Sequence, residues 1–442
     1  MSPWPLKTPN RNFRKPELLA PAGGFICLRA ALDAGADAVY FGLSGLNMRR
    51  RAKNFLIEDM AQIVAYCREC HAKCYLTLNT IVYEDEYPLL DSILDAALEA
   101  GVDAIICWDS AVIQSATQRN LTVHLSTQAS VSNSRAILWY HRNEGIRRFI
   151  LARECSLRHI EEIQTNLRKE LGEEAEHISL EAFIHGAMCV SISGRCFMSE
   201  ATCGESANRG ACLQPCRRKY RIMDVEGDDE FEIGRDYVMS PRDLCTMPFF
   251  EKIIQSGLCS LKIEGRMRSP EYVTTVVGAY REAIDYYFEN HMNLQEPSLT
   301  FSNDYKELKT RLTADMRRVF NRGFSSGYYM GRPLNDWSRS GNSQAELRKE
   351  TVGIVVNYYR KVGVAEIKVQ GSTFFEGDEL LIQGPSTGSL SVVVDSIHGE
   401  HVAVDSAACG TRVTIKVPRK VRPNDAVFRR FAVSGNYDDV PY

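Results

Sequence analysis

The sequence has no long hydrophobic run and almost no net charge. No apolar stretch approaches the ~18 residues of a membrane-spanning helix. The opening residues, Met-Ser-Pro-Trp-Pro-Leu-Lys, also lack the continuous apolar segment of a secretory signal. A formal net charge of −3 over 442 residues gives no chain-wide indication of nucleic-acid binding. We therefore expect a cytoplasmic protein that does not associate with a membrane.

Local signatures of two large peptidase classes are also missing. The chain contains no His-Glu-x-x-His motif for a catalytic zinc, and no Gly-x-Ser-x-Gly segment serves as a nucleophile elbow. A cysteine nucleophile paired with His185 is the peptidase mechanism that these absences leave open. Several thiols crowded together, however, are better metal ligands than nucleophiles.

Cysteine is the residue that the sequence has in excess, and the excess is local. Five of the 14 cysteines fall within 28 residues, and a sixth ends the segment Ser-Pro-Arg-Asp-Leu-Cys at 240–245. These residues are Cys189, Cys196, Cys203, Cys212, Cys216 and Cys245. They lie in glycine-rich polar sequence, whereas structural cysteines are usually buried on apolar faces. In a reducing compartment, such clustered thiols indicate an iron–sulfur cluster or a zinc site.

The first 290 residues repeat one pattern: an amphipathic helix, a glycine and a short apolar strand. Evenly apolar short strands are typical of parallel sheets that are covered on both faces. The predicted strands lie near 17–21, 37–42, 73–81, 103–108, 121–126, 148–152, 178–184 and 259–264. The predicted helices include 57–70, 87–100, 135–144, 157–171 and 248–256. Eight such units predict an α/β fold, a TIM-type (β/α) barrel over 1–295, with a doubly wound open sheet as the alternative.

Three segments depart from this repeat. The seventh connection, at about 186–246, is abnormally long and carries the cysteine-rich insertion, which is typical of a functional loop or one organised by a metal. Residues 296–346 are polar and mixed, and we expect a linker segment there. Over 347–435, short alternating strands separated by turn signals predict an all-β C-terminal domain, a small barrel.

Polar side chains recur where the predicted strands end. They are Asn79, Asp109, Gln128, Arg153, Glu154, His185, Lys262, Glu264 and Arg266. Because the carboxyl ends of the strands form the active face of a barrel, we expect these side chains to share a pocket. Basic runs occur at 49–51, 217–219 and 416–422, and the second directly abuts the cysteines. Positive charge beside a reactive centre suits an anionic substrate.

Several segments together resemble the collagenase-like peptidase family U-32. They are Glu17–Gly23, Leu125–Gln128, Glu181–Cys189, Ser193–Ser199, Asn208–Arg217, Ser240–Cys245 and Leu261–Arg266. The match spans about residues 16–290, and the predicted β domain resembles the family's C-terminal domain. Although the family carries a peptidase label, its better understood members are oxygen-independent RNA or ubiquinone hydroxylases that hold a 4Fe–4S cluster.

The resemblance implies an iron–sulfur enzyme of RNA modification. Members of this length are similar to tRNA hydroxylation proteins, which make 5-hydroxyuridine at the wobble position with prephenate as a required metabolite. The alternatives are hydroxylation of a cytidine in 23S rRNA, a collagenase-like peptidase, a zinc-stabilised binding protein without catalysis and a partner in ubiquinone-type hydroxylation. Hydroxylation of a pyrimidine is redox chemistry that ordinary side chains cannot perform, so a cofactor is needed.

Site residues follow from the resemblance, motif by motif. It implies cluster ligands at Cys189, Cys196 and Cys212, with Cys245 or Cys216 as the fourth and Cys203 as a bystander. The residues expected to act in catalysis are Glu181, His185, Lys262, Glu264 and Arg266. The residues expected to bind substrate are Asn79, Gln128, Glu154, Arg217 and Arg218. We expect a small carboxylate such as prephenate beside the cluster, tRNA or alternatively rRNA as the macromolecular substrate, and a protein partner of the same family.

Overall fold

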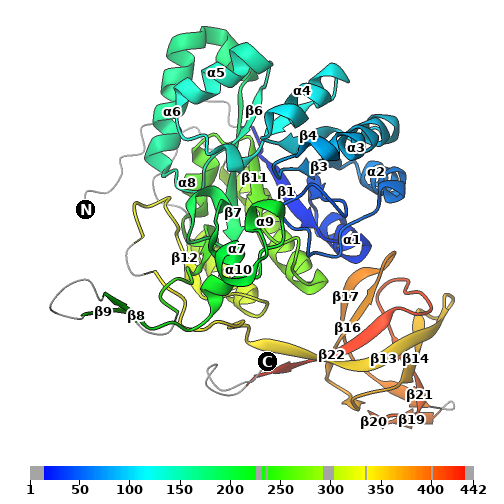
Figure 1. Ribbon diagram of the computed structural model, residues 1–442. Coiled ribbons are helices and arrows are strands. Elements are labelled where there is room, and N and C mark those ends of the chain that lie inside the picture. The colour runs from blue at the N-terminus through cyan, green and yellow to red at the C-terminus, as the bar shows by residue number, and fades with distance from the viewer. Residues whose placement is uncertain are drawn as a thin grey trace.

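Two sheets organise the chain (Figure 1). The computed structural model describes residues 14–224, 231–234, 237–291, 303–333, 336–399 and 402–433. The opening heptapeptide and residues 296–302 of the expected linker lie outside the described residues. A ten-stranded sheet contains the parallel strands of the N-terminal part, and an eight-stranded antiparallel sheet forms the C-terminal part.

The parallel strands close into a barrel. They are β1 (Glu17–Ala22), β2 (Ala38–Phe41), β3 (Lys73–Leu78), β4 (Ala104–Cys107), β5 (Val123–Leu125), β6 (Arg148–Ile150), β7 (Ser179–Gly186) and β11 (Ser260–Ile263). Strand β11 pairs in parallel with β1 on one side and with β7 on the other. This closure confirms the predicted TIM-type barrel and excludes the doubly wound sheet, whose two edge strands would remain apart. Each strand begins within two residues of its predicted start.

Helices cover the outside of the barrel. They are α1 (Phe25–Asp33), α2 (Met60–Glu69), α3 (Tyr87–Ala100), α4 (Ser110–Gln118), α5 (Ser134–Glu144), α6 (Leu157–Leu171), α8 (Phe250–Gln255) and α9 (Pro270–His291). Their buried faces follow the helical period; in α3 these are Leu90, Ile93, Leu94 and Ala97. The glycine that ends this helix, Gly101, has φ 75°, as the predicted left-handed cap requires.

The expected linker contains regular structure. Helix α10 (Asn303–Arg317) packs against α9, with the rings of Tyr286 and Tyr305 stacked 5.5 Å apart. Strand β12 (Phe324–Ser325) then adds to the edge of the barrel sheet. The polar sequence hid α10 because only a narrow stripe of the helix, including Leu312 and Met316, is buried.

The C-terminal part is all-β, as predicted. Its strand order is β17-β16-β22-β13-β14-β21-β18-β19, and every pairing is antiparallel. The strands are β13 (Leu347–Tyr359), β14 (Val364–Val369), β16 (Glu379–Gly384), β17 (Gly388–Val393), β18 (Ile397–Gly399), β19 (Val402–Val404), β21 (Arg412–Lys416) and β22 (Ala426–Ala432). They surround an apolar core separate from that of the barrel. An ion pair of 3.0 Å between Lys349 and Glu271 ties this part to helix α9.

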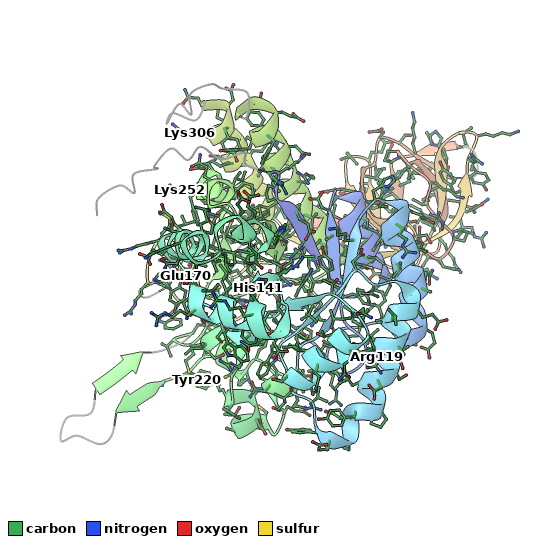
Figure 2. All side chains as sticks on the ribbon, turned by 90° about the horizontal axis from the view of Figure 1, so that it is seen from above. Arg119, His141, Glu170, Tyr220, Lys252 and Lys306 are labelled. Carbon is green, nitrogen blue, oxygen red and sulfur yellow. The ribbon has the colours of Figure 1, made fainter. Side chains whose placement is uncertain are left out.

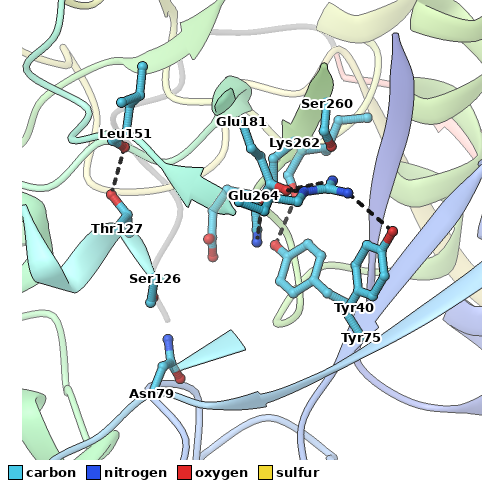
Figure 3. A network of polar contacts seen from close by, with 12 residues as sticks. Tyr40, Tyr75, Asn79, Ser126, Thr127, Leu151, Glu181, Ser260, Lys262 and Glu264 are labelled. Atoms are coloured by element: carbon cyan, nitrogen blue, oxygen red, sulfur yellow. Dashed lines mark hydrogen bonds and ion pairs between the residues drawn. The ribbon is translucent and has the colours of Figure 1, made fainter. Parts of the chain in front are cut away.

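An ion network fills part of the barrel interior (Figure 3). The fully buried Glu181 accepts hydrogen bonds from Arg148 Nη2 at 2.7 Å and from Lys262 Nζ at 3.0 Å. Arg148 also pairs with Glu17, whose carboxylate accepts from Tyr75 Oη at 2.8 Å. Burial alone would raise the pKa of the Glu181 carboxyl, but Lys262 and Arg148 outweigh burial and lower the pKa to about 2. The network therefore places ionised groups inside the barrel with their charges compensated.

We expect Glu181→Leu to lower the free energy of unfolding by about 3–5 kcal/mol, because two buried cations would lose their shared carboxylate. Glu162→Leu is the matched control, since Glu162 pairs with Arg158 at 2.8 Å on the surface of α6, where the Glu162 side chain is 52% exposed. That change should cost less than about 1 kcal/mol. Urea unfolding followed by circular dichroism measures both. Equally small losses would show that the network does not stabilise the barrel.

Candidate functional site

The cysteine-bearing loop lies over the carboxyl ends of the barrel strands. Its polar side chains and backbone bond to residues that follow β3, β5 and β6. The anchoring pairs are Arg209 with the carbonyl of Ile81, Arg195 with Ser130 and the Ser193 amide with Glu154. Because these anchors lie at three separate strand ends, the loop spans the mouth of the barrel.

Four of the loop cysteines form one electrostatic neighbourhood. Burial raises the pKa of the Cys216 thiol, and adjacent Arg217 lowers it. The charges of Cys189, Cys212 and Cys196 each add to the rise. The structure therefore brings Cys189, Cys196 and Cys212 near enough to Cys216 for their charges to act on its thiol, although the four are spread over 28 residues of sequence.

Backbone amides point at two of these sulfurs. The Met198 amide lies 3.3 Å from Cys196 Sγ, and the Gln214 amide lies 3.4 Å from Cys212 Sγ. Gln214 adopts the left-handed conformation, with φ 55°, which turns its amide back toward Cys212. Hydrogen bonds from amides to sulfur are among the contacts that tune iron–sulfur sites.

The four cysteines match the donor set of a 4Fe–4S cluster, which takes four thiolates. Tetrahedral zinc requires every sulfur within about 2.3 Å of one point. Within the described residues, no three Cys, His, Asp or Glu side chains converge closely enough to hold a single metal ion. The described loop therefore forms no compact zinc site, and a cluster at these cysteines stays a prediction.

Cys245 lies elsewhere. It belongs to β10 (Asp243–Cys245), which adds antiparallel to β7 with Cys245 opposite His185. The side chain is 1% exposed, and burial raises the pKa of its thiol to about 11. Cys203 ends helix α7 (Met198–Cys203), where its sulfur lies 3.3 Å from the hydroxyl of neighbouring Thr202. Of the two expected fourth ligands, Cys216 is the one that the structure brings beside the other three cysteines.

Arg266 lies just beyond β11 with almost no compensation. The residue is 4% exposed, and its Nη1 donates to Thr77 Oγ1 at 2.8 Å. No carboxylate within the described part of the chain forms an ion pair with it. Burial lowers the pKa of this guanidinium to about 10. Glu264 offsets part of that lowering from a distance. A buried guanidinium without a direct ion pair attracts an anion, and a role of Arg266 in binding stays a prediction.

Two glycines create the space for Arg266. A Cβ atom on Gly42, at the end of β2, would lie 2.1 Å from Arg266 Nη1. A Cβ atom on Gly23, after β1, would lie 1.9 Å from the carbonyl oxygen of Arg266. Close packing therefore requires glycine at both positions, and the Glu17–Gly23 segment that resembles the family supplies one of them.

Glu264 has its charge fully compensated. Its Oε1 accepts from Arg49 Nη2 at 3.0 Å, and its Oε2 lies 3.3 Å from Arg153 Nη2. Burial alone would raise the pKa of Glu264, but Arg49 and Arg153 lower it to about 2. A carboxylate of such low pKa is a weak general base and a strong anchor for arginines. The pKa of Arg49 is raised, chiefly by Glu264 and to a smaller extent by Cys189. The charges of Glu264 and its two arginines therefore border the thiols of the loop.

Three expected substrate-binding residues lie beneath the loop. Asn79 Nδ2 donates to Gln128 Oε1 at 3.1 Å, and each residue is 8% exposed. A Cβ atom on Gly194 of the loop would lie 4.0 Å from Gln128 Nε2. Glu154 is engaged by the Ser193 amide at 2.9 Å. The structure therefore brings these three together at the mouth, and their role in binding substrate stays a prediction.

His185 does not line the mouth as expected. A bulge in β7 pairs Phe183 with Lys262 but His185 with Ile263, so His185 takes the outward register. Its ring then packs 5.7 Å from that of Tyr280 on α9. Burial, with Arg268 nearby, lowers the pKa of His185 to about 3. The neutral imidazole is packed against α9 and lies away from the other residues that were predicted to act in catalysis.

Glu181, Lys262 and Arg217 are buried in places that differ from those expected. Glu181 and Lys262 bond to each other within the barrel interior, at 0% and 3% exposure, and not at its mouth. Arg217 is 9% exposed, and its guanidinium donates to Ser240 Oγ at 2.9 Å and to backbone carbonyls. Arg217 therefore braces the loop and presents no free face to a substrate. Arg218 beside it is exposed.

Sequence reasoning missed two participants in this site. Arg49 opens the basic run 49–51, which is typical of a solvated surface, yet its guanidinium contacts Glu264. Thr77 lies within a buried strand and carries no motif, although its hydroxyl holds Arg266. Side chains alternate between the two faces of a strand, so Thr77 lies on the same side of β3 as Tyr75 and Asn79. This alternation could have predicted that Thr77 faces the site.

Comparison with known proteins places the chain in a family. The profile of Peptidase family U32 matches residues 23–339. A protein of Porphyromonas gingivalis named collagenase is 39% identical over 93% of this chain and 97% of its own length. The tRNA hydroxylation protein P1 of Bacillus subtilis is 33% identical, over 93% of this chain and 94% of its own. The 23S rRNA 5-hydroxycytidine C2501 synthase of Escherichia coli is 31% identical over 80% of this chain but half of its own length.

These relatives carry names from two different chemistries, hydroxylation of RNA and cleavage of collagen. The match covers well over half of the chain. The chain belongs to peptidase family U32.

Proposed function

We propose that this protein hydroxylates RNA, with tRNA as the substrate and an iron–sulfur cluster at the barrel mouth. One observation supports the proposal: a buried guanidinium, which forms no ion pair within the described residues, lies at the barrel mouth that the cysteine-bearing loop covers. A site of this kind takes a redox cofactor and a small anion side by side. The relative from Bacillus subtilis, named for tRNA hydroxylation, supports tRNA as the substrate class.

The cluster would be held by Cys189, Cys196, Cys212 and Cys216. When bound, a 4Fe–4S cluster supplies the electron transfer that amino-acid side chains cannot provide. The chain's contribution is to hold the thiols as ligands. The amides of Met198 and Gln214 donate toward the sulfurs of Cys196 and Cys212, and Arg217 offsets part of the rise in the Cys216 pKa that burial causes.

The small anion would be a carboxylate metabolite such as prephenate, bound by Arg266. The guanidinium fork fixes a carboxylate in orientation, and Thr77 fixes the guanidinium. Glu264 supports the site indirectly, because it holds Arg49 and Arg153 at the mouth beside Cys189. The buried position of Arg266 excludes water, which strengthens its attraction for the anion.

The RNA would meet the loop from the solvent side. Phe197 directly follows Cys196 and is 72% exposed, and Ile192 is 65% exposed. An exposed aromatic ring beside a reactive centre is a platform on which an extruded base can stack. Exposed Arg50 and Arg218 supply positive charge for phosphates near this platform.

Ribosomal RNA is the second candidate, because the Escherichia coli relative is named for a 23S rRNA cytidine. A peptidase is favoured by names alone: that of the family, the collagenase of Porphyromonas gingivalis and an uncharacterized protease of Methanocaldococcus jannaschii. Its requirements conflict with the geometry, since Cys245 beside His185 is buried with a thiol pKa of about 11. Ser325 lies in a Gly-x-Ser-x-Gly segment, yet its hydroxyl contacts Asp336 rather than a histidine. Neither residue is therefore an activated nucleophile.

The function is tested by mass spectrometry of nucleosides from a deletion strain. Loss of 5-hydroxyuridine-type modification from tRNA, restored by the wild-type gene, is the expected result. If tRNA is unchanged while a 5-hydroxycytidine disappears from rRNA, the second candidate replaces the first. No change in either RNA, in a strain without a second family member, would refute RNA hydroxylation.

We expect Cys216→Ser to lose the cluster and Cys245→Ser to keep it. Wild-type protein purified without oxygen should be brown and hold about four irons per chain, the number in such a cluster. Iron content and visible absorbance measure the difference, and circular dichroism should show a folded barrel in both variants. The opposite pattern would restore Cys245 as the fourth ligand. Stoichiometric zinc without iron would support the zinc-stabilised alternative.

We expect Arg266→Met to weaken prephenate binding by at least about 30-fold, since losing one partner of a buried charged contact costs 2 kcal/mol or more. Iron content should be unchanged. Stability should stay level or rise, because the variant removes an uncompensated buried charge. Arg51→Met, at an exposed arginine, is the matched control. Calorimetric titration and thermal unfolding measure both effects; a variant that binds prephenate normally would exclude Arg266 as the carboxylate site.

A further inference from the structure

A basic groove runs along the outside of the barrel between helices α5 and α6. Its volume is about 580 Å³, and the residues that line it include Arg135, Trp139, Arg142, Asn143, Lys169 and Glu170. In Figure 2, Glu170 marks the α6 side of this region and His141 marks α5. None of the site residues described above lines the groove, so its chemistry is independent of the barrel mouth.

The cations of the groove are not used by the fold. Arg135, Arg142 and Lys169 are exposed, and within the described residues none of them forms an ion pair or a side-chain hydrogen bond. The nearest contrast is Arg158 on the same helix as Lys169, which pairs with Glu162 at 2.8 Å. Three cations against the single carboxylate of Glu170 give the groove a net positive charge, although the whole chain carries −3.

An exposed tryptophan lies in this basic groove. Trp139 is 55% exposed, and Tyr140 supports its ring edge-on at 5.0 Å. Arg135, Trp139 and Arg142 are spaced four and three residues apart, so they share one face of α5. The two arginines are about 10 Å apart along the helix axis at 1.5 Å per residue. Cations at such intervals, with an aromatic face between them, match phosphates that flank a nucleotide base.

The helix α5 that lines the groove begins close to an anchor of the loop over the barrel mouth. Arg195 of the loop donates to Ser130 Oγ at 2.9 Å, and α5 begins four residues later at Ser134. Because α5 starts at the carboxyl end of the barrel strands, Arg135 is the groove cation nearest to the mouth. Positive charge thus extends from the loop to the flank of the barrel, at Arg195, Arg135, Arg142 and Lys169.

We propose that the groove between α5 and α6 is a second RNA-binding surface, which holds the backbone of the substrate RNA outside the barrel mouth. This inference rests on the proposed RNA substrate. Arg135, Arg142 and Lys169 contact phosphates, and Trp139 stacks on a base or packs against a ribose. An acidic peptide would match the charge of the groove, but it would leave the exposed tryptophan ring without a partner of its own shape.

The test is a titration of labelled tRNA with full-length protein, followed by fluorescence anisotropy at several salt concentrations. Arg142→Ala/Lys169→Ala should reduce the slope of log K against log salt by about 1.4–1.8, since each lost phosphate contact removes 0.7–0.9. Trp139→Ala should weaken binding by about fivefold or more through lost stacking. The matched control is Lys252→Ala/Lys306→Ala, two lysines on other helices that Figure 2 labels, which should bind like wild type.

The outcomes separate the two proposals. If wild-type protein does not bind tRNA at all, the proposed substrate is wrong. If wild-type protein binds tRNA and the groove variants match the control pair in slope and affinity, the second surface is refuted while the substrate stands. If the groove variants lose affinity for polyglutamate but not for tRNA, the groove binds an acidic protein instead. Thermal unfolding of every variant excludes a folding defect as the cause.

Discussion

Charge compensation inside a closed barrel is the constraint on which the rest of this structure depends. A barrel of eight short strands encloses an interior without bulk water, so each ionised group there must meet an opposite charge. Glu181 meets Arg148 and Lys262, and Glu264 meets Arg49 and Arg153. Arg266 differs, since within the described residues its guanidinium forms a hydrogen bond with a threonine hydroxyl and no ion pair, and Glu264 acts on it only from a distance. In a fold that pairs its buried carboxylates so closely, a cation with this weaker compensation is a candidate place for an anionic ligand.

The same constraint explains why the sequence predicted the barrel well and the roles of its polar residues less well. The strands and helices followed from glycine caps and from the apolar period, both of which are local. Lys262 and His185 were predicted to act at the mouth because each is polar and close to a strand end, and the family resemblance implied that Glu181 acts in catalysis. Their side chains point elsewhere: two lie in the interior, and one is turned outward by a bulge. Partners supplied by other strands decide these roles, and a single strand does not reveal its partners.

The cysteine-bearing loop shows a similar division between local and distant information. Its thiol density was visible in the sequence, but the choice between Cys216 and Cys245 was not. The two differ because β10 carries Cys245 into the edge of the barrel sheet, opposite His185. Loops hold few apolar residues of their own, and this one depends on Arg217 and on anchors such as Ser193 with Glu154. A loop organised in this way can cover the mouth and still leave Phe197 and Ile192 exposed to a partner.

An unpaired charge inside the barrel indicates more about function than an unpaired charge on the surface. Inside the barrel, an unpaired cation is costly and therefore points to a ligand that repays the cost of burying it. On the surface, water solvates a lone lysine or arginine at little cost, so exposure alone indicates nothing. The groove between α5 and α6 differs from an ordinary surface because three unpaired cations share it with an exposed tryptophan. A single exposed tryptophan needs no explanation by itself. Beside three fixed positive charges, however, it suits a partner with both an apolar face and negative charge, and a nucleotide has both.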